Sequence, residues 1–302
     1  MAAWDVATGG NVFGTRTELS PELKRKQIQL FELLRSYGRV AVALSAGVDS
    51  SVVARAAAEM LGEHAIAATA NSPSLADGEL EAAQRLAADV GLRHVVLETE
   101  EFANTNYASN PSNRCYFCKT ELYTQLLTRQ AELGFDVIIN GANLDDVGDH
   151  RPGMVAASEH RVRSPLLEAG FSKDDVRTLA RHWGLSVWDK PAAPCLSSRI
   201  AYGVEVTAER VRRIDAAERW LRDQLRVREL RVRLEADDLA RIEVPLPNLA
   251  ELTTSPLREQ VVEHLLGLGF RRVTIDLQGF RSGSLNAGLQ ERELVPLELP
   301  TA

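Results

Sequence analysis

The chain lacks the features that mark membrane and secreted proteins. No apolar run approaches the roughly 20 residues that cross a bilayer, and residues 1–20 are polar and glycine-rich, without the apolar core of a signal peptide. Only three cysteines occur, an odd number whose spacing does not suggest a secreted disulfide framework. These absences predict a cytoplasmic protein with no membrane partner.

Lysine is also scarce. The chain has five lysines, and arginine supplies every other fixed positive side chain. A GC-rich genome is the simplest explanation, so abundant arginine does not by itself mark an anion site. The net charge of −7 argues against a broad surface for nucleic acid, although it allows a local basic pocket. We therefore expect no nucleic-acid partner.

The order of apolar patterns predicts an α/β fold. We expect strands at 40–44, 64–70, 94–97 and 137–140, and helices at 21–37, 50–61, 79–90, 120–133 and 173–183. Such alternation predicts a parallel, doubly wound sheet with helices on both faces.

The chain divides into three parts by composition. Residues 1–20 are expected to be a flexible tail, residues 21–200 the nucleotide-binding domain, and residues 201–302 a smaller α+β domain for substrate binding or oligomerisation. In the last part we expect helices at 207–225 and 256–267 and strands at 229–235, 239–244 and 271–277.

The most informative segment is the run at residues 40–51, VAVALSAGVDSS. Apolar residues predict a buried strand, and a turn of small residues leads into a helix whose positive end favours an anion such as phosphate. No Gly-Lys-Ser/Thr closes the turn, so it is not a Walker motif. It resembles the PP-loop of ATP pyrophosphatases, Ser-Gly-Gly-x-Asp-Ser, with Ala46 in place of the first glycine. An ordinary strand–turn–helix corner is the alternative.

Ligands of parallel sheets lie at the carboxyl ends of the strands. Residues 45–51, the pair Asn71-Ser72 and residues 141–143 all follow predicted strand ends. We therefore expect these three segments to converge on one crevice.

The cysteines leave three interpretations open. Cys115 and Cys118 form Cys-Tyr-Phe-Cys within a stretch that reads as a polar loop, and Cys195 lies in Ala-Pro-Cys-Leu-Ser-Ser-Arg. A [4Fe–4S] cluster held by all three thiolates would leave one iron open, and this requires Cys195 to fold back to the pair. A redox disulfide is the second interpretation. Zinc is the third, but it normally takes four ligands, and no histidine has zinc-finger spacing.

Further segments carry a more specific resemblance. They are Asn71-Ser72, residues 146–153 (DVGDHRPG), residues 195–199 (CLSSR) followed by Tyr202-Gly203, and residues 279–283 (GFRSG). Together with the turn, this set resembles the LarE family over residues 21–290. These are ATP-dependent sulfur transferases that help to make the nickel-pincer nucleotide of lactate racemase.

The resemblance implies a two-stage reaction with Mg²⁺. ATP adenylates a carboxylate of pyridinium-3,5-biscarboxylic acid mononucleotide and releases pyrophosphate, and sulfur then displaces AMP to leave a thiocarboxylate. In the family, the cysteine of the Cys-x-Ser-Ser-Arg segment is the sulfur source, and Cys195 occupies that position. Members with three cysteines resemble proteins in which a cluster carries a replaceable sulfide. We therefore expect Cys115, Cys118 and Cys195 to hold a [4Fe–4S] cluster fed by sulfide or another sulfur donor, with sacrifice of the Cys195 sulfur as the alternative. The resemblance also implies a homo-oligomer.

Site roles follow from the resemblance and from residue chemistry. The expected ATP-phosphate contacts are Ser45, Gly47, Asp49, Ser50 and Ser51. Asn71 and Ser72 are expected to meet adenine or ribose and Gly141 to admit the nucleotide, with simple turn residues as the alternative. The expected magnesium ligands are Asp49, Asp146 and Asp149, of which the last two could instead form a solvated acidic loop.

Four residues are expected at the substrate. Arg199, Arg231 and Arg281 match positions that bind its phosphate and carboxylates, for which the planar arginine fork is suited. Glu218 matches an acidic position near the sulfur site, with a plain helix-surface glutamate as the alternative.

Two other classes of function remain open. One is a different PP-loop chemistry, such as tRNA thiolation or NAD or GMP synthesis. A tRNA enzyme needs a basic face, against which the net charge argues, and no glutaminase signature supplies ammonia. The other is a non-catalytic cluster carrier regulated by nucleotide. Pyrophosphate release that depends on the pyridinium substrate would separate these from the sulfur transferase.

Overall fold

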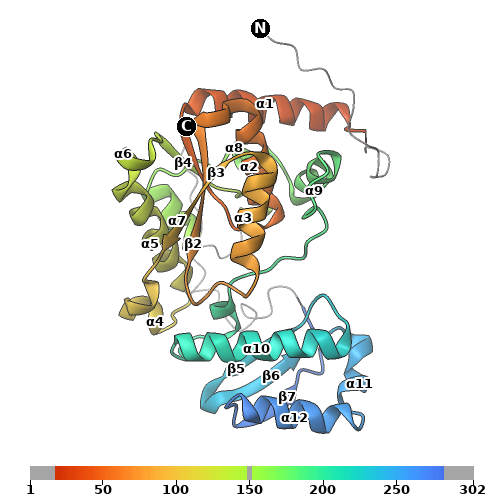
Figure 1. Ribbon diagram of the computed structural model, residues 1–302. Helices are drawn as coiled ribbons and strands as arrows, with labels where there is room; N and C mark the ends of the chain where they lie inside the picture. Colours follow the sequence, from red (N-terminus) through yellow and green to blue (C-terminus); the bar gives the residue numbers. More distant parts are fainter. Residues whose placement is uncertain (1–17, 148–151, 282–302) are drawn as a thin grey trace.

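A four-stranded parallel sheet forms the centre of the larger lobe (Figure 1). The computed structural model describes residues 18–147 and 152–281. The strand order is β3-β2-β1-β4, and all neighbouring pairs are parallel, which confirms the predicted α/β class. The strands are β1 (Val40–Ala43), β2 (Ala65–Asn71), β3 (Arg93–Glu98) and β4 (Val137–Ile139).

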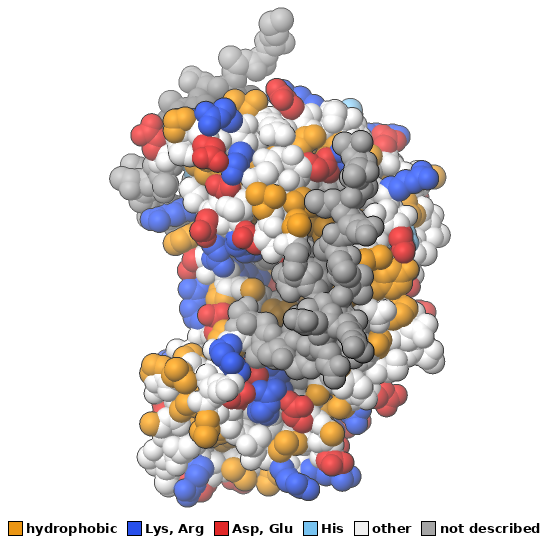
Figure 2. Space-filling view, turned by 180° about the vertical axis from the view of Figure 1, so that it is seen from behind, with side chains coloured by type: hydrophobic (Ala, Val, Ile, Leu, Met, Phe, Trp, Pro, Cys, Tyr) orange, Lys and Arg blue, Asp and Glu red, His pale blue; other side chains and the backbone are white. Residues whose placement is uncertain are grey.

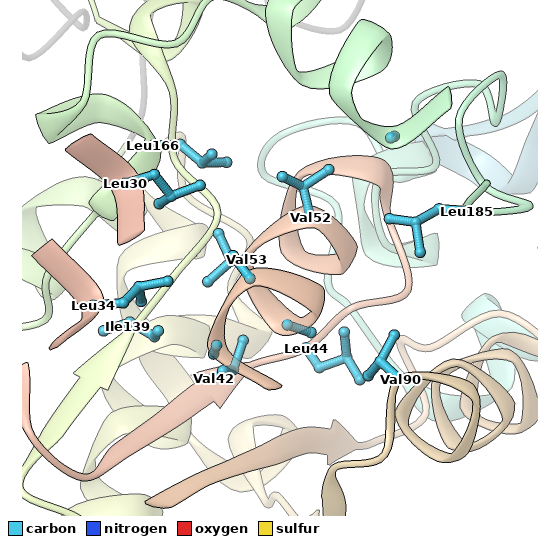
Figure 3. Packing of buried hydrophobic residues seen from close by; sticks show 14 of the residues in the cluster. Leu30, Leu34, Val42, Leu44, Val52, Val53, Val90, Ile139, Leu166 and Leu185 are labelled. Atoms are coloured by element: carbon cyan, nitrogen blue, oxygen red, sulfur yellow. The ribbon is translucent and has the colours of Figure 1, made fainter. Parts of the chain in front are cut away.

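Helices cover both faces of this sheet, as the alternating pattern predicts. One face carries α1 (Pro21–Tyr37), α2 (Val48–Leu61), α3 (Glu79–Val90) and α9 (Lys173–His182), and the other carries α5 (Arg114–Thr128) and α7 (Pro152–Glu159). On the first face, Leu30, Leu34, Val53 and Ile139 are fully buried (Figure 3). This packing fixes α2, and with it the turn that precedes α2.

Short elements connect the main ones. They are η1 (Gly62–His64), η2 (Glu101–Ala103), α4 (Thr105–Ala108), α6 (Gln130–Leu133), η3 (Leu144–Asp146), α8 (Pro165–Glu168), η4 (Leu196–Arg199), η5 (Ala236–Asp238), η6 (Leu246–Asn248) and α11 (Leu249–Leu252). Within the described ranges, none of the helices combines the length and the apolar character that a membrane span requires.

The smaller lobe is an α+β unit with its own core. Its sheet has the order β5-β6-β7, with β5 antiparallel and β7 parallel to β6. Helices α10 and α12 pack against it in the core that contains Leu196 and Ile200. These two residues follow Cys195 closely, so the smaller lobe anchors the chain just after this cysteine. The elements are α10 (Ala208–Leu225), β5 (Arg231–Glu235), β6 (Leu239–Glu243), α12 (Leu257–Gly267) and β7 (Arg272–Ile275).

The prediction that the cysteine pair lies in a polar loop is wrong. Cys115 and Cys118 lie in the first turns of α5, which begins six residues earlier than the predicted helix at 120–133. The polar residues 106–113 do form the approach to this helix, but Phe117 and Cys118 pack against the core of the smaller lobe. That tertiary contact extends the helix toward its amino end. The same predicted helix is interrupted at Arg129, between α5 and α6.

Candidate active site

The turn at residues 45–51 joins β1 to α2 at the carboxyl edge of the sheet. Its serines brace it from within: Ser50 Oγ and Ser51 Oγ donate to the Gly47 carbonyl at 3.2 and 2.7 Å, and the Ser45 amide donates to Ser50 Oγ at 3.2 Å. Gly47 caps α2 without a side-chain bond, so free amides remain at the helix end to meet an anion. Ala46, which stands where the PP-loop pattern has its first glycine, has φ 53°, a left-handed conformation that alanine rarely adopts.

Gly141 follows β4 and packs against this turn. A Cβ on Gly141 would lie 2.7 Å from the Ser50 amide nitrogen and 2.9 Å from the Asp49 carbonyl carbon. Only glycine fits, because both neighbours are backbone atoms that cannot move aside. The close packing of β4 on α2 therefore already requires this glycine, and admission of the nucleotide stays a prediction.

Asp49 joins three elements. Its Oδ1 accepts from Asn143 Nδ2 at 3.0 Å after β4, and its Oδ2 pairs with the ammonium of Lys173 at the start of α9. A second lysine, Lys190, donates to the Ala46 carbonyl at 3.2 Å and pairs with Glu79 at 2.7 Å. Two of the five lysines thus meet at this turn. No motif marks either one; the signal that could have found them is the scarcity of lysine itself.

The remaining residues predicted for nucleotide or magnesium have other partners. Asn71 Nδ2 donates to both oxygens of Glu98 at 3.0 Å, and Ser72 Oγ lies 2.8 Å from Ser74 Oγ. Asp146 caps η3 by accepting from the Asn143 amide at 3.0 Å. Asp149 lies outside the described residues. The nucleotide and metal roles of these residues stay predictions.

The three cysteines lie in one region. Burial raises the pKa of the Cys115 thiol, and the charge of Cys195 raises it further, although part of this residue is exposed. Burial raises the pKa of Cys118 to about 12, with a further contribution from Cys195 and opposition from Lys119. Arg114, which precedes Cys115 at the start of α5, donates to the Ser197 carbonyl at 2.9 Å, so the chain brings the Cys195 segment back to the helix that carries the pair. Across residues 18–147 and 152–281, no three His, Cys, Asp or Glu side chains are arranged to hold a single metal ion.

The segment that contains Cys195 is held against the larger lobe by hydrogen bonds. The Leu196 amide donates to the Ser74 carbonyl at 2.8 Å, and the Tyr107 hydroxyl lies 2.8 Å from Ser197 Oγ. Arg114, the first residue of α5, donates to the Ser197 carbonyl at 2.9 Å. Cys195 therefore sits between the two lobes.

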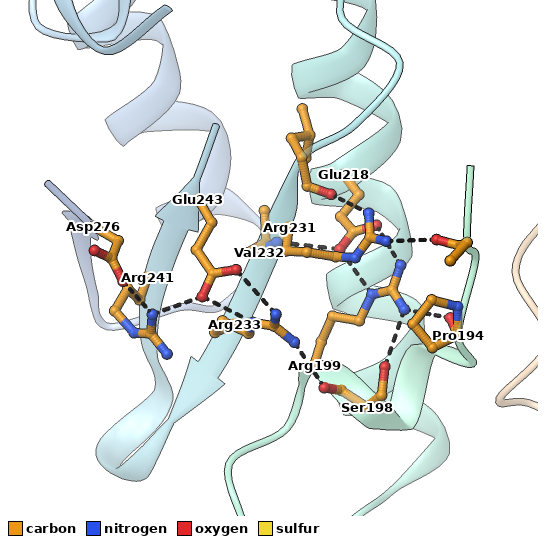
Figure 4. Close-up of polar contacts among 12 residues, drawn as sticks. Pro194, Ser198, Arg199, Glu218, Arg231, Val232, Arg233, Arg241, Glu243 and Asp276 are labelled. Atoms are coloured by element: carbon orange, nitrogen blue, oxygen red, sulfur yellow. Dashed lines mark hydrogen bonds and ion pairs between the residues drawn. The ribbon is translucent and has the colours of Figure 1, made fainter. Parts of the chain in front are cut away.

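A buried ion-pair cluster lies on the other side of this segment (Figure 4). Arg199 donates to both oxygens of Glu218 at 3.0 and 3.2 Å and to the Cys195 carbonyl at 3.0 Å. Glu218 also pairs with Arg222 and accepts from the Val232 amide at 3.2 Å. Although burial disfavours its charged form, Arg199 and Arg222 hold the pKa of Glu218 below its ordinary value. Glu218 is 1% exposed, so it is not a helix-surface residue.

Arg231 differs from Arg199 in its partners. It is 6% exposed and donates to the carbonyls of Leu230 at 2.7 Å and Ala192 at 3.0 Å. No described carboxylate forms an ion pair with it. Burial, with added repulsion from Arg199, lowers the pKa of Arg231 to about 10. Such a guanidinium is suited to an anionic ligand.

Two further arginines lie in the same part of the smaller lobe. Arg233 forms a two-pronged ion pair with Glu243 at 3.1 and 3.0 Å and donates to the Ser198 carbonyl at 2.9 Å; the sequence analysis did not single it out. Arg281 is exposed at the end of the described chain, and its charge helps to lower the pKa of Asp276. Figure 2 shows Lys and Arg side chains gathered where the two lobes meet.

One segment connects the two halves of the site. Lys190 contacts the turn at residues 45–51, and five residues later Cys195 begins the segment that Arg114 and Arg199 bond. A nucleotide at the turn and an anion at the arginines would therefore face the same inter-lobe region, with thiols at its edge. The arrangement is suited to activation of an anionic substrate by ATP followed by sulfur chemistry.

Comparisons with known proteins agree with this arrangement. The profile of the asparagine synthase family matches residues 31–145. Uncharacterized protein slr1717 of Synechocystis is 45% identical over 87% of this chain and 98% of its own length. The tRNA-specific 2-thiouridylase MnmA of Azorhizobium caulinodans is 32% identical, over 51% of this chain and 49% of its own length.

A further relative covers nearly the whole chain. The pyridinium-3,5-bisthiocarboxylic acid mononucleotide synthase of Lactiplantibacillus plantarum is 36% identical over 90% of this chain and 98% of its own length. The match spans both lobes, including the turn at residues 45–51 and the Cys195 segment. The chain therefore belongs to the LarE family of ATP-dependent sulfurtransferases, which use a PP-loop.

Proposed function

We propose that the enzyme adenylates a carboxylate of pyridinium-3,5-biscarboxylic acid mononucleotide and converts it to a thiocarboxylate in nickel-pincer cofactor synthesis. The observation that carries this proposal is the short segment from Lys190 to Cys195, which ties the nucleotide turn to the cysteine region. ATP activation and sulfur delivery then occur in one inter-lobe space. The likeness to the Lactiplantibacillus enzyme over both lobes supports the same substrate.

The first stage follows from the turn. A substrate carboxylate oxygen attacks the α-phosphorus of ATP, the bond to the β-phosphate oxygen breaks, and pyrophosphate leaves. Free amides at the start of α2 and the ammonium groups of Lys173 and Lys190 bind the phosphates. Asp49, Asp146 and Asp149 are the proposed Mg²⁺ ligands, and bound Mg²⁺ would neutralise charge on the triphosphate. Lys173 then exchanges Asp49 for phosphate when the nucleotide binds.

Substrate recognition falls to the arginines. Arg231 has a buried guanidinium whose bonds go to two carbonyls, so the phosphate or free carboxylate of the mononucleotide would complete its charge balance. Arg281 closes the same region from the end of the smaller lobe. Arg199 is engaged with Glu218 and with the Cys195 carbonyl, so it and Glu218 act by holding the cysteine in place.

The sulfur stage uses the three cysteines. We propose that Cys115, Cys118 and Cys195 hold a [4Fe–4S] cluster: Arg114, which precedes Cys115 at the start of α5, donates to the Ser197 carbonyl at 2.9 Å and so holds the Cys195 segment near the pair. When bound, a cluster with an open iron supplies a replaceable sulfide. Sulfur attacks the acyl adenylate carbon, the bond to the AMP oxygen breaks, and the thiocarboxylate forms. Sacrifice of the Cys195 sulfur is the alternative for the same stage.

The test is an anaerobic assay with ATP, Mg²⁺, sulfide and the pyridinium mononucleotide. We expect AMP and pyrophosphate in amounts that depend on the mononucleotide, and a product in which sulfur replaces oxygen. ADP and orthophosphate as main products would contradict the proposal. Turnover on unmodified tRNA in place of the mononucleotide would favour thiouridylase activity, for which the likeness covers about half of the chain.

Mass spectrometry of the protein separates the two sulfur sources. Product that exceeds one sulfur per chain while Cys195 keeps its mass supports delivery from sulfide. Loss of one H₂S from Cys195 in step with product would show sacrifice. Iron analysis of the same anaerobic sample checks the cluster, which requires about four iron atoms per chain.

A further inference from the structure

Asn110 lies between α4 and α5 and is completely buried. Its side-chain nitrogen donates to three carbonyls of the connection, residues 200–206, which joins η4 to α10: those of Ala201 at 2.8 Å, Val204 at 2.9 Å and Ile200 at 3.3 Å. Its side-chain oxygen accepts from Arg114, the first residue of α5. One side chain therefore bonds both the connection that follows the Cys195 segment and the helix that carries the other two cysteines.

Backbone hydrogen bonds join the same two parts of the chain. The Gly203 amide donates to the Asn110 carbonyl at 3.0 Å, and the Val206 amide donates to the Ala108 carbonyl at 2.8 Å. Gly203 has φ 80°, a left-handed conformation that suits glycine. The pair Tyr202-Gly203, which the sequence analysis singled out, thus belongs to the turn that Asn110 bonds.

Asparagine meets every requirement of this position. Asn110 has φ 57°, and asparagine adopts a left-handed backbone more readily than most residues other than glycine. Its amide supplies N–H donors for the carbonyls of the connection and an oxygen for Arg114 at the same time. Aspartate lacks the donors and glycine lacks the whole side chain, but both tolerate this backbone conformation.

The contacts of Asn110 act on Cys195 through the short helix η4. The Ser198 amide donates to the Cys195 carbonyl at 3.0 Å, which ties the cysteine to η4. Arg114, which bonds Asn110, donates to the Ser197 carbonyl at 2.9 Å. Asn110 and Arg114 together therefore hold η4, and with it Cys195, against the start of α5.

We propose that Asn110 is a positioning residue of the sulfur site: it docks the connection on the start of α5 and so holds Cys195 beside the cysteine pair. Arg233 bonds the same segment from β5, at the Ser198 carbonyl, so it fixes Cys195 relative to the smaller lobe and not relative to α5. What the docking serves rests on the proposed sulfur stage, whereas its test needs no turnover.

Two substitutions test the side chain without straining the backbone. Asn110→Gly removes every side-chain bond at this left-handed position. Asn110→Asp keeps an oxygen for Arg114 but loses the N–H donors for the connection. Arg161→Gly is the matched control, because Arg161 is also left-handed, with φ 54°, but is exposed in the turn after α7.

The first readout is native hydrogen exchange of the full chain. The Gly203 and Val206 amides are protected by their bonds to the Asn110 and Ala108 carbonyls. We expect both to exchange at least about tenfold faster in Asn110→Gly and Asn110→Asp, because a local opening of the connection is then enough. Amides of the central sheet should change far less, and Arg161→Gly should match wild type. A merely structural role predicts instead that connection and sheet amides accelerate together.

The second readout is bridging of the reduced thiols by dibromobimane, which links two thiols only when they lie close together. Cys115 and Cys118 are three residues apart on one helix, so a bridge between them is the internal control. We expect bridges from Cys195 to the pair, counted against bridges within the pair, to fall at least about fivefold in both Asn110 variants, the factor that corresponds to one ordinary hydrogen bond. Arg161→Gly should keep the wild-type ratio.

Each outcome decides the assignment. Wild-type exchange at Gly203 and Val206, or a wild-type bridging ratio, in a folded Asn110→Gly variant would overturn it. If that variant does not fold, the same readouts in Asn110→Asp decide. Loss of bridging in the glycine variant alone would also overturn it, because the contact with Arg114 would then suffice.

The proposed sulfur stage can fail separately. If wild type forms no bridge to Cys195, the three thiols do not share a site and the proposed cluster fails. The exchange contrast at Gly203 and Val206 then decides by itself whether Asn110 docks the connection.

Discussion

The turn at residues 45–51 is braced by groups within five residues of one another, whereas the cysteine region is assembled from distant segments. In the turn, serine hydroxyls bond a carbonyl three or four residues away. In the cysteine region, Arg114 reaches Ser197 across 83 positions and Tyr107 reaches it across 90. The turn can form wherever the strand and the helix that it joins meet. The cysteine region forms only when the two lobes pack against each other.

The two regions also balance charge differently. At the turn, Asp49 faces Lys173 and Lys190 faces Glu79, and all four side chains keep some contact with solvent. Around Cys195, the pairs of Arg199 with Glu218 and Arg233 with Glu243 are buried. Partly exposed pairs can exchange partners when a ligand arrives, whereas buried pairs hold fixed positions because breaking them leaves an uncompensated charge.

The largest expected effect is on catalysis at the turn. Asp49→Asn keeps an oxygen for Asn143 but removes the charge that faces Lys173. We expect pyrophosphate release to fall at least about 100-fold, because a proposed carboxylate ligand of Mg²⁺ is lost. The melting temperature should change little, since the residue is partly exposed. Asp136→Asn, at the far side of the lobe in an exposed pair with Arg39, is the control. Wild-type turnover in Asp49→Asn would show that ATP binds elsewhere.

The second effect is on stability at the buried pair. Glu218→Gln leaves Arg199 and Arg222 facing a neutral amide, and we expect a loss of about 3–5 kcal/mol in unfolding free energy at pH 7. Because the folded pKa of Glu218 lies below its ordinary value, its stabilisation is present above about pH 4.3 and is lost as pH falls through the folded pKa. Denaturant unfolding should therefore show wild type and variant converging in acid. A pH-independent difference would mean that packing, and not charge, is what the variant loses.

A smaller effect on stability is expected at Gly141, where the end of β4 packs against the start of α2. Gly141→Ala places a methyl group within 2.9 Å of two backbone atoms of α2, and we expect a loss of about 1–3 kcal/mol in unfolding free energy. Gly267→Ala is the matched control, because it lies in α12 with nothing within 4 Å of the added carbon and should be neutral or slightly stabilising. Equal thermal shifts in the two variants would contradict the close packing of β4 on α2.

The difference between local and distant contacts also explains which features the sequence could predict. The parallel strands, the helices between them and the turn follow from local periodicity and from small residues at strand ends, and the structure has them within a few positions. The predicted start of α5 was wrong because Phe117 and Cys118 pack against the core of the smaller lobe. The pattern of neighbouring residues in the sequence does not predict a contact with a distant part of the chain.

At the site, residue types were predictable but partners were not. Glu218 and Arg199 were matched as functional positions, yet only the packed lobes show that they bond each other and hold the Cys195 carbonyl. Lys173 and Lys190 reach the turn from residues more than 100 positions away, so no motif around the turn contains them. The sequence therefore predicts the turn itself, whose contacts are local, better than the partners of the residues around Cys195.

The smallest expected effect is on stability, and it tests whether the backbone conformation of the turn itself holds the turn in place. Ala46 has a left-handed backbone, which costs a non-glycine residue roughly 1–2 kcal/mol. Ala46→Gly relieves this strain but adds about 0.4–1 kcal/mol of conformational freedom to the unfolded chain, so we expect a net gain of roughly 0.5–1 kcal/mol in unfolding free energy, or about 1–2 °C in melting temperature.

The control for this substitution is Ala58→Gly in the interior of α2, where glycine should instead cost about 1 kcal/mol. Turnover of Ala46→Gly should stay near wild type, because Lys190 bonds the backbone carbonyl of residue 46 and not its side chain. A destabilisation equal to that of Ala58→Gly would mean that the turn has no left-handed residue in solution. The free amides of α2 would then be oriented by the contacts of Lys173 and Lys190, and the turn would depend on distant segments as the cysteine region does.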